Sequence, residues 1–202
     1  MLPCLVSLED PDSKPNSEKV FYIMSVTPFL KWAGGKRWLT SAQPNLINFK
    51  FKRYIEPFLG SGAMFFHLMP EQAILSDKNK LLIDTYRCIK EDWHKIVNFL
   101  EIHAKNHSTS YYYQLRGAIF DDIYERTAQF LYLNRTCWNG LYRVNKNGIF
   151  NVPKGTKDNV LLSADDFMAT ASLLQNTILK EIAQALGVHY TTISKVINSG
   201  EN

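Results

Sequence analysis

Cysteine is scarce in this sequence: its residues Cys4, Cys88 and Cys137 are odd in number and lack metal-ligand spacing. Such usage is typical of reduced thiols, so we expect a cytoplasmic chain with neither a metal site nor a disulfide framework. Long hydrophobic runs are also missing, because none approaches the roughly 20 residues of a membrane span. The amino terminus lacks the basic start and long apolar core of a signal peptide, so we expect neither a leader nor membrane association.

A strong charge of one sign is missing too. Lys and Arg number 23 against 19 Asp and Glu, which gives a formal net charge of +4. This mild excess permits an anionic partner without requiring one. The 202 residues, 46% of them hydrophobic, are expected to form one domain, or one domain with a small appendage, around a real core.

The segment Tyr54–Leu68 reads YIEPFLGSGAMFFHL and combines an apolar run, the glycines Gly60 and Gly62, and a second apolar run. This pattern predicts a strand, a glycine turn and a helix. Glycine allows positive φ and a close approach to a ligand, and such turns bind nucleotides at the carboxyl ends of strands in open α/β sheets. A plain tight connection explains the same pattern, so neighbouring motifs must distinguish the two.

A basic motif, Phe29–Leu39, precedes this turn and reads FLKWAGGKRWL. Its double glycine followed by Lys36 and Arg37 suits a carboxylate or a phosphate. Taken alone, a glycine helix cap with solvated basic residues is the better explanation. Trp32 and Trp38 favour a pocket instead, because large aromatic side chains supply a flat apolar wall.

A second short strand is predicted over Ala73–Asp77 and ends on an acidic residue. In doubly wound folds, a carboxylate about 20 residues after the glycine turn binds the ribose hydroxyls, and Asp77 lies at nearly this separation. The alternative is an aspartate that caps the helix beginning near Asn79. The upstream glycine turn favours ribose binding.

Apolar residues at helical spacing predict core-facing helices over Lys80–Lys90, Asp92–His103 and Ile119–Asn134, and a small strand is predicted over Thr177–Leu179. We expect three histidines to face solvent: His94, His103 and His107.

The segment Arg135–Gly155, RTCWNGLYRVNKNGIFNVPKG, mixes basic and aromatic residues with Asn-Gly pairs. Asn147-Gly148 between apolar flanks predicts a hairpin. Such a hairpin offers phosphate contacts, base-edge readers and a wedge for a base stack, although a surface hairpin with solvated charges is the simpler alternative. Trp138 favours the nucleic-acid interpretation, because a core position does not explain it.

Together these motifs, with LSDKN around Asp77, resemble the adenine-N6 DNA methyltransferases of the GATC-methylating type, over roughly Pro28–Lys180 and in the family's order. The resemblance implies an α/β, Rossmann-like S-adenosylmethionine-dependent methyltransferase fold with a DNA-recognition insertion. It also implies S-adenosylmethionine as cofactor and double-stranded DNA as partner, and it leaves three roles open for the methyl mark: restriction-modification, phage biology and replication control.

The resemblance assigns two sets of residues. The cofactor set, in which Lys36 would lie near the methionine carboxylate and Asp77 would take the ribose hydroxyls, is Trp32, Lys36, Pro57, Phe58, Gly60, Gly62 and Asp77. The DNA set, in which Trp138 falls where the family often has an aromatic residue that invades the duplex, is Lys31, Arg116, Trp138, Asn139, Leu141, Arg143 and Pro153. An arginine at such a position can bond a guanine bidentately, with about 1–3 kcal/mol of discrimination.

The catalytic motif of the family does not occur in the sequence. The family flips the target adenine and holds its amino group with an Asp-Pro-Pro-Tyr turn, whose acceptors favour the positive charge that develops on nitrogen. Neither Asp-Pro-Pro-Tyr nor Asn-Pro-Pro-Tyr is found, and Asn151-Val152-Pro153 belongs to the hairpin. No catalytic residue is therefore assigned.

The chain divides by these patterns into five parts. A disordered lead (1–24) is followed by a cofactor-binding part (25–105), a DNA-recognition insertion (106–160), a return to the methyltransferase core (161–180) and a tail (181–202). The tail resembles the helix-turn-helix of small DNA-binding regulators, with an amphipathic hairpin packed on the core as the alternative.

The sequence thus looks like the amino-terminal part of a methyltransferase joined to an unrelated tail. We expect an incomplete sheet in which Tyr54–Phe58 has an unpaired edge. Methyl transfer would then need a partner chain that supplies the catalytic half. The alternatives are a non-enzymatic, sequence-specific DNA-binding protein and a degenerate fragment.

Overall fold

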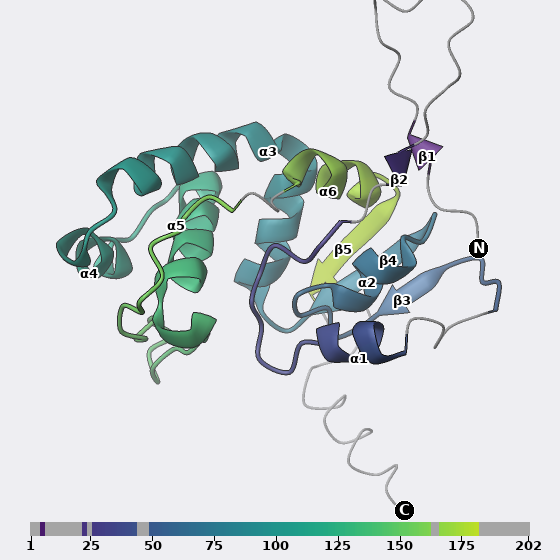
Figure 1. Ribbon diagram of the computed structural model, residues 1–202, viewed down its shortest axis with the longest axis horizontal. Helices are drawn as coiled ribbons and strands as arrows, with labels where there is room; N and C mark the ends of the chain where they lie inside the picture. Colours follow the sequence, from purple (N-terminus) through teal and green to yellow (C-terminus); the bar gives the residue numbers. More distant parts are fainter. Residues whose placement is uncertain (1–4, 7–21, 24–25, 44–48, 163–165, 182–202) are drawn as a thin grey trace, which may run out of the picture.

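The computed structural model describes residues 5–6, 22–23, 26–43, 49–162 and 166–181, and these form a mixed α/β fold (Figure 1). A small parallel sheet consists of β3 (Tyr54–Glu56), β4 (Ala73–Asp77) and β5 (Thr177–Glu181), in the order β3-β4-β5. Tyr54 pairs with Ala73, which pairs with Thr177. The predicted strands are confirmed, and within the described residues β3 lies at the sheet edge, as expected.

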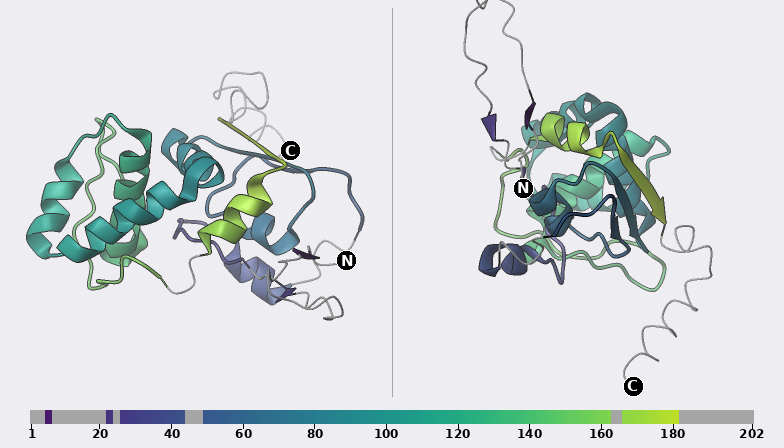
Figure 2. Two further views of the ribbon diagram at one scale, coloured as in Figure 1. Left: turned by 90° about the horizontal axis from the view of Figure 1, so that it is seen from above. Right: turned by 90° about the vertical axis from the view of Figure 1, so that its right-hand side faces the viewer.

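Helices connect these strands and build a second lobe. α1 (Arg37–Ala42) packs against α2 (Ala63–Leu68), which joins β3 to β4. The long α3 (Lys80–Asn106) runs from the sheet to the lobe of α4 (Thr109–Gly117) and α5 (Ile123–Thr136), which lies beside the sheet in Figure 2. α6 (Phe167–Leu174) packs on α3 and leads into β5. Two further short strands, β1 (Leu5–Val6) and β2 (Tyr22–Ile23), pair antiparallel.

One hydrophobic cluster runs through both lobes. Its members without exposed surface include Phe65 and Leu75 beside the sheet, Ile89 on α3, and Tyr112 and Leu131 in the helical lobe. Each such burial stabilises the fold by about 1.5–3 kcal/mol, so α3 holds the two lobes together chiefly by apolar packing.

α3 confirms one expectation and corrects another. The two helices predicted between Lys80 and His103 are present as two helical segments that meet at a kink, where Asp92 has non-helical dihedral angles. His103 is buried rather than solvent-facing, because it follows Ile96 and Leu100 on the inward face of α3. His107 is also largely covered, whereas His94 is exposed as expected.

The segment predicted as a hairpin forms a loop with few sheet pairs. It begins with the 3-10 helix η1 (Trp138–Gly140), and isolated bridges join Val144 to Phe150 and Cys137 to Lys154. The turn at Asn147-Gly148 is present, since Gly148 N donates to Asn145 O at 3.0 Å and Gly148 has φ +76°. The turn prediction is therefore confirmed.

Several expectations fall on other parts of the chain. Apart from β1 and β2, the expected lead (1–24) lies outside the described residues, as does the predicted helix-turn-helix beyond Glu181.

Within the described ranges, no helix is both long and apolar enough to cross a membrane. Cys88 and Cys137 are buried free thiols whose pKa values burial raises.

Candidate functional site

The glycine turn lies at the carboxyl ends of β3 and β4. Gly60 N donates to Asp77 Oδ2 at 3.0 Å, and Asn79 N donates to Asp77 Oδ1 at 2.9 Å. Asp77 therefore joins the turn to the start of α3, while the Asn79 side chain caps that helix by accepting from Leu82 N. Each Asp77 oxygen retains a lone pair beyond the one used here, which leaves acceptor capacity for a hydroxyl.

Two aromatic side chains close over this turn and explain its glycines. A Cβ at Gly60, where φ is +52°, would lie 2.9 Å from Trp32 Cδ1. A Cβ at Gly62, where φ is +67°, would lie 2.8 Å from Tyr86 Oη. Both glycines are therefore required by dihedral angle and by space, because the two aromatic side chains occupy the room that a Cβ would need.

Lys36 lies beside the same turn, just before α1. Its Nζ donates to Glu56 Oε1 and to Phe58 O, each at 3.0 Å. Burial raises the pKa of the Glu56 carboxyl, and the Lys36 ammonium opposes that rise. The site thus contains a buried carboxylate held by a half-exposed cation at the end of β3.

Trp32 connects this turn to the loop that follows α5. Its ring stacks on Tyr142, with centroids 5.2 Å apart and an interplanar angle of 22°, and its edge meets Phe130 at 6.3 Å. The structure accordingly brings the predicted cofactor residues together at the carboxyl ends of β3 and β4, with Trp32 on the side that faces the loop. Pro57 and Phe58 continue β3 into the turn, and Pro57 O accepts from Ser76 Oγ at 3.3 Å.

The predicted DNA residues gather around the start of this loop. The buried Asn134 side chain accepts from Lys31 N at 3.0 Å and donates to Lys31 O at 2.8 Å. The Gly140 backbone packs tightly against the Lys31 side chain: a Cβ added at Gly140 would lie 2.3 Å from Lys31 Cδ. Lys157 faces Lys31, and this like charge, together with burial, lowers the pKa of Lys31.

η1 presents an aromatic side chain and an amide on the surface. Trp138 is 58% exposed, and its N donates to Pro153 O at 2.9 Å. Asn139 is exposed with φ +54°, whereas Leu141 is half-buried and packs against the core. Trp138, Asn139 and Pro153 therefore form one exposed group.

The two predicted DNA-contacting arginines have different environments. Arg143 is exposed, and its Nε donates to Asn151 Oδ1 at 2.9 Å across the loop. Arg116 is half-buried: it donates to Val152 O at 3.1 Å and lies over the Tyr113 ring. Arg116 thus supports the loop from beneath, while Arg143 is presented outward.

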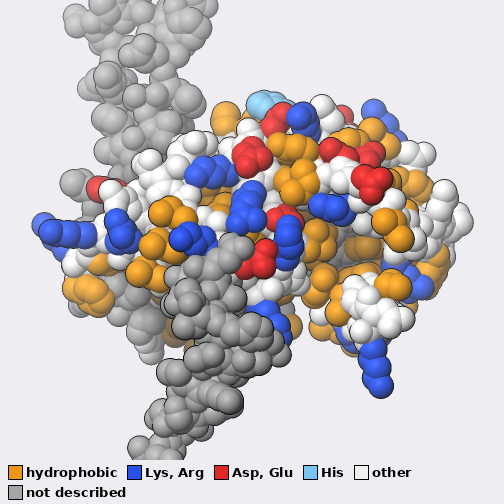
Figure 3. Space-filling model, turned by 180° about the vertical axis from the view of Figure 1, so that it is seen from behind, with side chains coloured by type: hydrophobic (Ala, Val, Ile, Leu, Met, Phe, Trp, Pro, Cys, Tyr) orange, Lys and Arg blue, Asp and Glu red, His pale blue; other side chains and the backbone are white. Residues whose placement is uncertain are grey.

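Side chains of both charges lie on the face seen in Figure 3, with Lys and Arg beside Asp and Glu over its middle. In the described part of the chain, no group of His, Cys, Asp and Glu residues could hold a metal ion.

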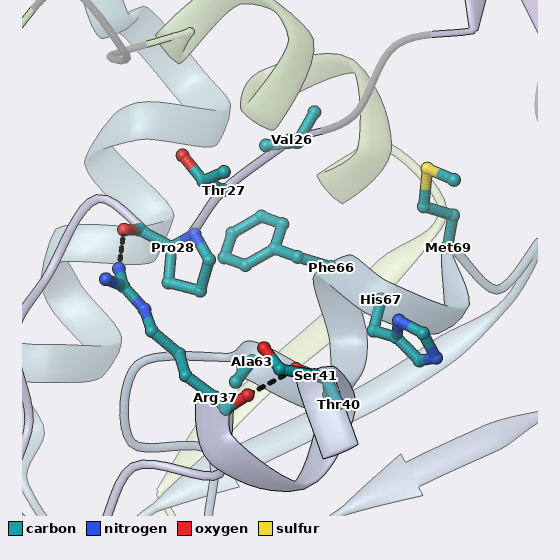
Figure 4. A pocket seen from close by; sticks show the side chains of 10 residues that line it. All are labelled: Val26, Thr27, Pro28, Arg37, Thr40, Ser41, Ala63, Phe66, His67 and Met69. Carbon is teal, nitrogen blue, oxygen red and sulfur yellow. Dashed lines mark hydrogen bonds between the residues drawn. The ribbon is translucent and has the colours of Figure 1, made fainter. Parts of the chain in front are cut away.

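A separate cleft of about 330 Å³ lies between α1, α2 and the segment before Phe29 (Figure 4). The Arg37 guanidinium borders it and donates to Pro28 O, while Thr40 Oγ1 donates to Arg37 O at 2.9 Å. None of the predicted site residues lines this cleft.

The sequence patterns did not single out Glu56 or Asn134, and they gave Arg135 and Tyr142 only as members of the basic and aromatic segment. All but Tyr142 are buried polar side chains, and Arg135 donates to Val160 O at 2.7 Å. A charged or amide residue inside an apolar segment was the available signal for them. Tyr142 gave no such signal, because its stacking partner is far away in sequence.

Comparison with known proteins agrees with these observations. The family model for D12 class N6 adenine-specific DNA methyltransferases matches residues 32–190, a range that ends inside the segment predicted as a separate tail. A type II methyltransferase of Lactococcus lactis subsp. cremoris, M1.LlaDCHI, is 36% identical over 164 residues, covering 78% of this chain and 58% of the relative. The type II methyltransferase M.MjaIII of Methanocaldococcus jannaschii is 36% identical over 176 residues, covering 76% and 61%.

A DNA adenine methylase of Haemophilus influenzae is 32% identical over 173 residues, which cover 82% of this chain and 59% of that protein. The chain therefore spans about three fifths of the length of these relatives (58–61%). The resemblance predicted from the sequence motifs is confirmed. Because the matched range includes most of its residues, the chain belongs to the D12 class of N6 adenine-specific DNA methyltransferases.

Proposed function

We propose that this chain supplies the cofactor-binding and DNA-recognition parts of an enzyme that transfers a methyl group from S-adenosylmethionine to adenine N6 in double-stranded DNA. We further propose GATC as the target, a Rossmann-like fold for the complete enzyme, and the five-part division of the chain given above. The names of two relatives as type II methyltransferases support a place in restriction-modification. The observation that carries the proposal is the meeting of Gly60, Asp77 and Lys36 at one end of the sheet.

The residues at this end fit the cofactor. Trp32 packed against Gly60 and Tyr86 packed against Gly62 hold the turn in the shape in which Gly60 N meets Asp77. Asp77 would accept hydrogen bonds from ribose hydroxyls, and Lys36 would pair with the amino-acid carboxylate. Trp32, Pro57 and Phe58 would supply apolar walls. The cofactor, when bound, provides the methyl group.

The loop after η1 is the proposed DNA-reading surface. Trp138 is exposed where a wedge would enter the duplex, and Arg143 is presented for a guanine edge. Lys31, Asn139, Leu141 and Pro153 would complete this surface. Arg116 would act through the loop backbone, because its guanidinium bonds Val152 O.

The proposed catalytic partner would dock on the sheet. In the described part of the chain, β3 pairs with β4 alone, and Ile55 and Phe58 are exposed beside that edge. A polypeptide with the Asp-Pro-Pro-Tyr motif could add there and supply the acceptors for the adenine amino group. This chain would contribute cofactor binding and DNA recognition. The partner would accept the proton and stabilise the positive charge that develops at N6.

Titration calorimetry with S-adenosylhomocysteine tests the first part. We expect saturable binding that Lys36→Ala and Asp77→Ala each weaken, while Lys52→Ala, an exposed lysine before β3, leaves it unchanged. Absence of binding by the unsubstituted chain would contradict the cofactor assignment.

A methyl-transfer assay with labelled cofactor and GATC-containing duplex DNA tests the second part. We expect transfer only after addition of a polypeptide that carries the remaining part of the Lactococcus lactis relative. Transfer by the chain alone would show that the partner is unnecessary.

A non-enzymatic DNA-binding protein is the second candidate, favoured by the exposure of Trp138 and Arg143. It predicts DNA binding that weakens steeply with salt and that does not depend on Lys36 or Asp77. The same calorimetry distinguishes the two functions.

A further inference from the structure

The Lys36 ammonium is held at two of its three donor positions. Nζ donates to Glu56 Oε1 and to Phe58 O, each at 3.0 Å. Both acceptors belong to β3 and its continuation, so Nζ is fixed at the carboxyl end of that strand. An ammonium has three N–H donors, and within the described residues the third has no partner.

Glu56 is the rigid member of this pair. It is 4% exposed and lies in β3, paired in register with Leu75 of β4, whereas the Lys36 side chain is half-exposed. Its strand neighbour Tyr54 projects on the same face, since side chains two residues apart share a face of a strand. A buried carboxylate on a paired strand can therefore set the position of a flexible lysine.

Asp77, a further acidic residue at this end of the sheet, has different partners. The Asp77 oxygens accept from the amides of Gly60 and Asn79 rather than from Lys36. α1, which follows Lys36, has no buried residue that would fix the lysine from its other side. Among the described side chains, Glu56 is thus the acceptor that anchors Lys36.

We propose that Glu56 is a positioning residue, which holds Lys36 Nζ so that its remaining N–H meets the carboxylate at the amino-acid end of the cofactor. The inference rests on the proposed function, since it concerns the same site. A bond that only fastens α1 to the sheet would have no influence on which ligands bind. A positioning bond would decide how strongly the site prefers a ligand with a carboxylate.

The test compares S-adenosylhomocysteine with 5′-methylthioadenosine, which has no amino-acid end, by titration calorimetry. Glu56→Leu removes the acceptor but keeps the buried volume, and we expect the affinity ratio of the two ligands to fall about 10-fold, the effect of one lost charge-assisted hydrogen bond. Affinity for 5′-methylthioadenosine should stay within about twofold. Glu56→Gln keeps an acceptor oxygen and should retain the original ratio.

Asp84 offers a matched control, because it is also 4% exposed and accepts from a lysine, Lys80, away from the turn. Asp84→Leu should leave the ligand ratio unchanged. Thermal unfolding followed by circular dichroism checks each variant, and Glu56→Met replaces Glu56→Leu if the latter does not fold.

The outcomes separate the two proposals. An unchanged ratio in Glu56→Leu would overturn the positioning role while leaving cofactor binding intact. A fall in Glu56→Gln equal to that in Glu56→Leu would also overturn it, because charge rather than position would then matter. If the unsubstituted chain binds neither ligand, the proposed function itself fails.

Discussion

Trp32 stacks on Tyr142, although 110 positions separate them in the sequence: their ring centroids lie 5.2 Å apart with an interplanar angle of 22°. The same indole leaves no room for a side chain at Gly60. This contact joins the glycine turn at the end of β3 to the loop that carries Trp138 and Arg143. We therefore propose that cofactor binding and DNA recognition share this stacked aromatic pair, Trp32 and Tyr142.

Loss of the stacked pair should lower the stability of the fold, including the glycine turn that it covers. Tyr142→Ala is expected to lower the free energy of unfolding by about 1–3 kcal/mol, because it removes an aromatic pair and its buried area. Urea denaturation followed by circular dichroism measures this change. Tyr142→Phe keeps the ring and should be close to unsubstituted protein. Equal stability of the two variants would contradict the role of the stack.

Gly62 should tolerate alanine poorly. Gly62→Ala adds a methyl group 2.8 Å from Tyr86 Oη at φ +67°, so strain and a clash combine. We expect a loss of about 2–4 kcal/mol in the free energy of unfolding.

Gly148 is the matched control for that substitution. It has φ +76° but no atom within 4 Å of an added Cβ, so Gly148→Ala should lose only about 1 kcal/mol. Adding Tyr86→Phe to Gly62→Ala should recover part of the loss, because the clashing hydroxyl is then removed. Equal losses in the two glycine variants would show that the clash is absent.

His103 should make the fold sensitive to acid. Burial lowers the pKa of His103 from 6.5 to about 4, and its Nδ1 shares a hydrogen bond with Tyr111 Oη at 2.8 Å. Between these pKa values the unfolded chain binds the proton and the folded chain does not, so stability falls as the pH falls. The free energy of unfolding should fall by at most about 3 kcal/mol between pH 7 and pH 4.

Urea midpoints recorded from pH 7 to pH 4 measure this loss. His103→Phe should flatten the pH dependence, whereas His94→Phe, at an exposed site, should leave it unchanged. An equally steep curve for His103→Phe would assign the acid sensitivity to other groups.

Trp138 should matter for DNA and hardly for folding. Its side chain is 58% exposed, so Trp138→Ala should leave the urea midpoint nearly unchanged. If its ring enters the duplex, affinity for GATC-containing DNA should fall about 10-fold or more. Fluorescence anisotropy with a labelled duplex measures the affinity. Trp38→Ala, at a 69% exposed tryptophan on α1, is the control, and equal effects of the two substitutions would contradict the wedge role.

Much of the fold around the site could be predicted from local patterns. The glycine turn before α2, the strand Ala73–Asp77 and the turn at Gly148 are present where the sequence placed them. Hydrophobic periodicity and glycine conformation act between near neighbours, so a short segment carries the whole signal. The family was also predicted, because its motifs are themselves short segments.

The burial of His103 and the hydrogen bond of Arg116 could not be predicted from local patterns. His103 was predicted to face solvent, but Tyr111 of α4 and Tyr132 of α5 pack against its ring and cover it. Arg116 was predicted as a DNA contact, yet its partner Val152 O lies on a loop brought back from further along the chain. The roles assigned to the site residues remain predictions that the proposed experiments test.

Short segments of the chain were enough to predict the family, the glycine turn and the strand that ends at Asp77. Three contacts depend on the packed molecule: Glu56 holds Lys36, Trp32 stacks on Tyr142, and Asp77 accepts from the amide of Gly60. The partners in these contacts are separated along the chain. Conformational preferences are set by neighbouring residues, whereas these contacts form only when the β3 end, the β4 end and the loop after α5 have been brought together by burial of the common core.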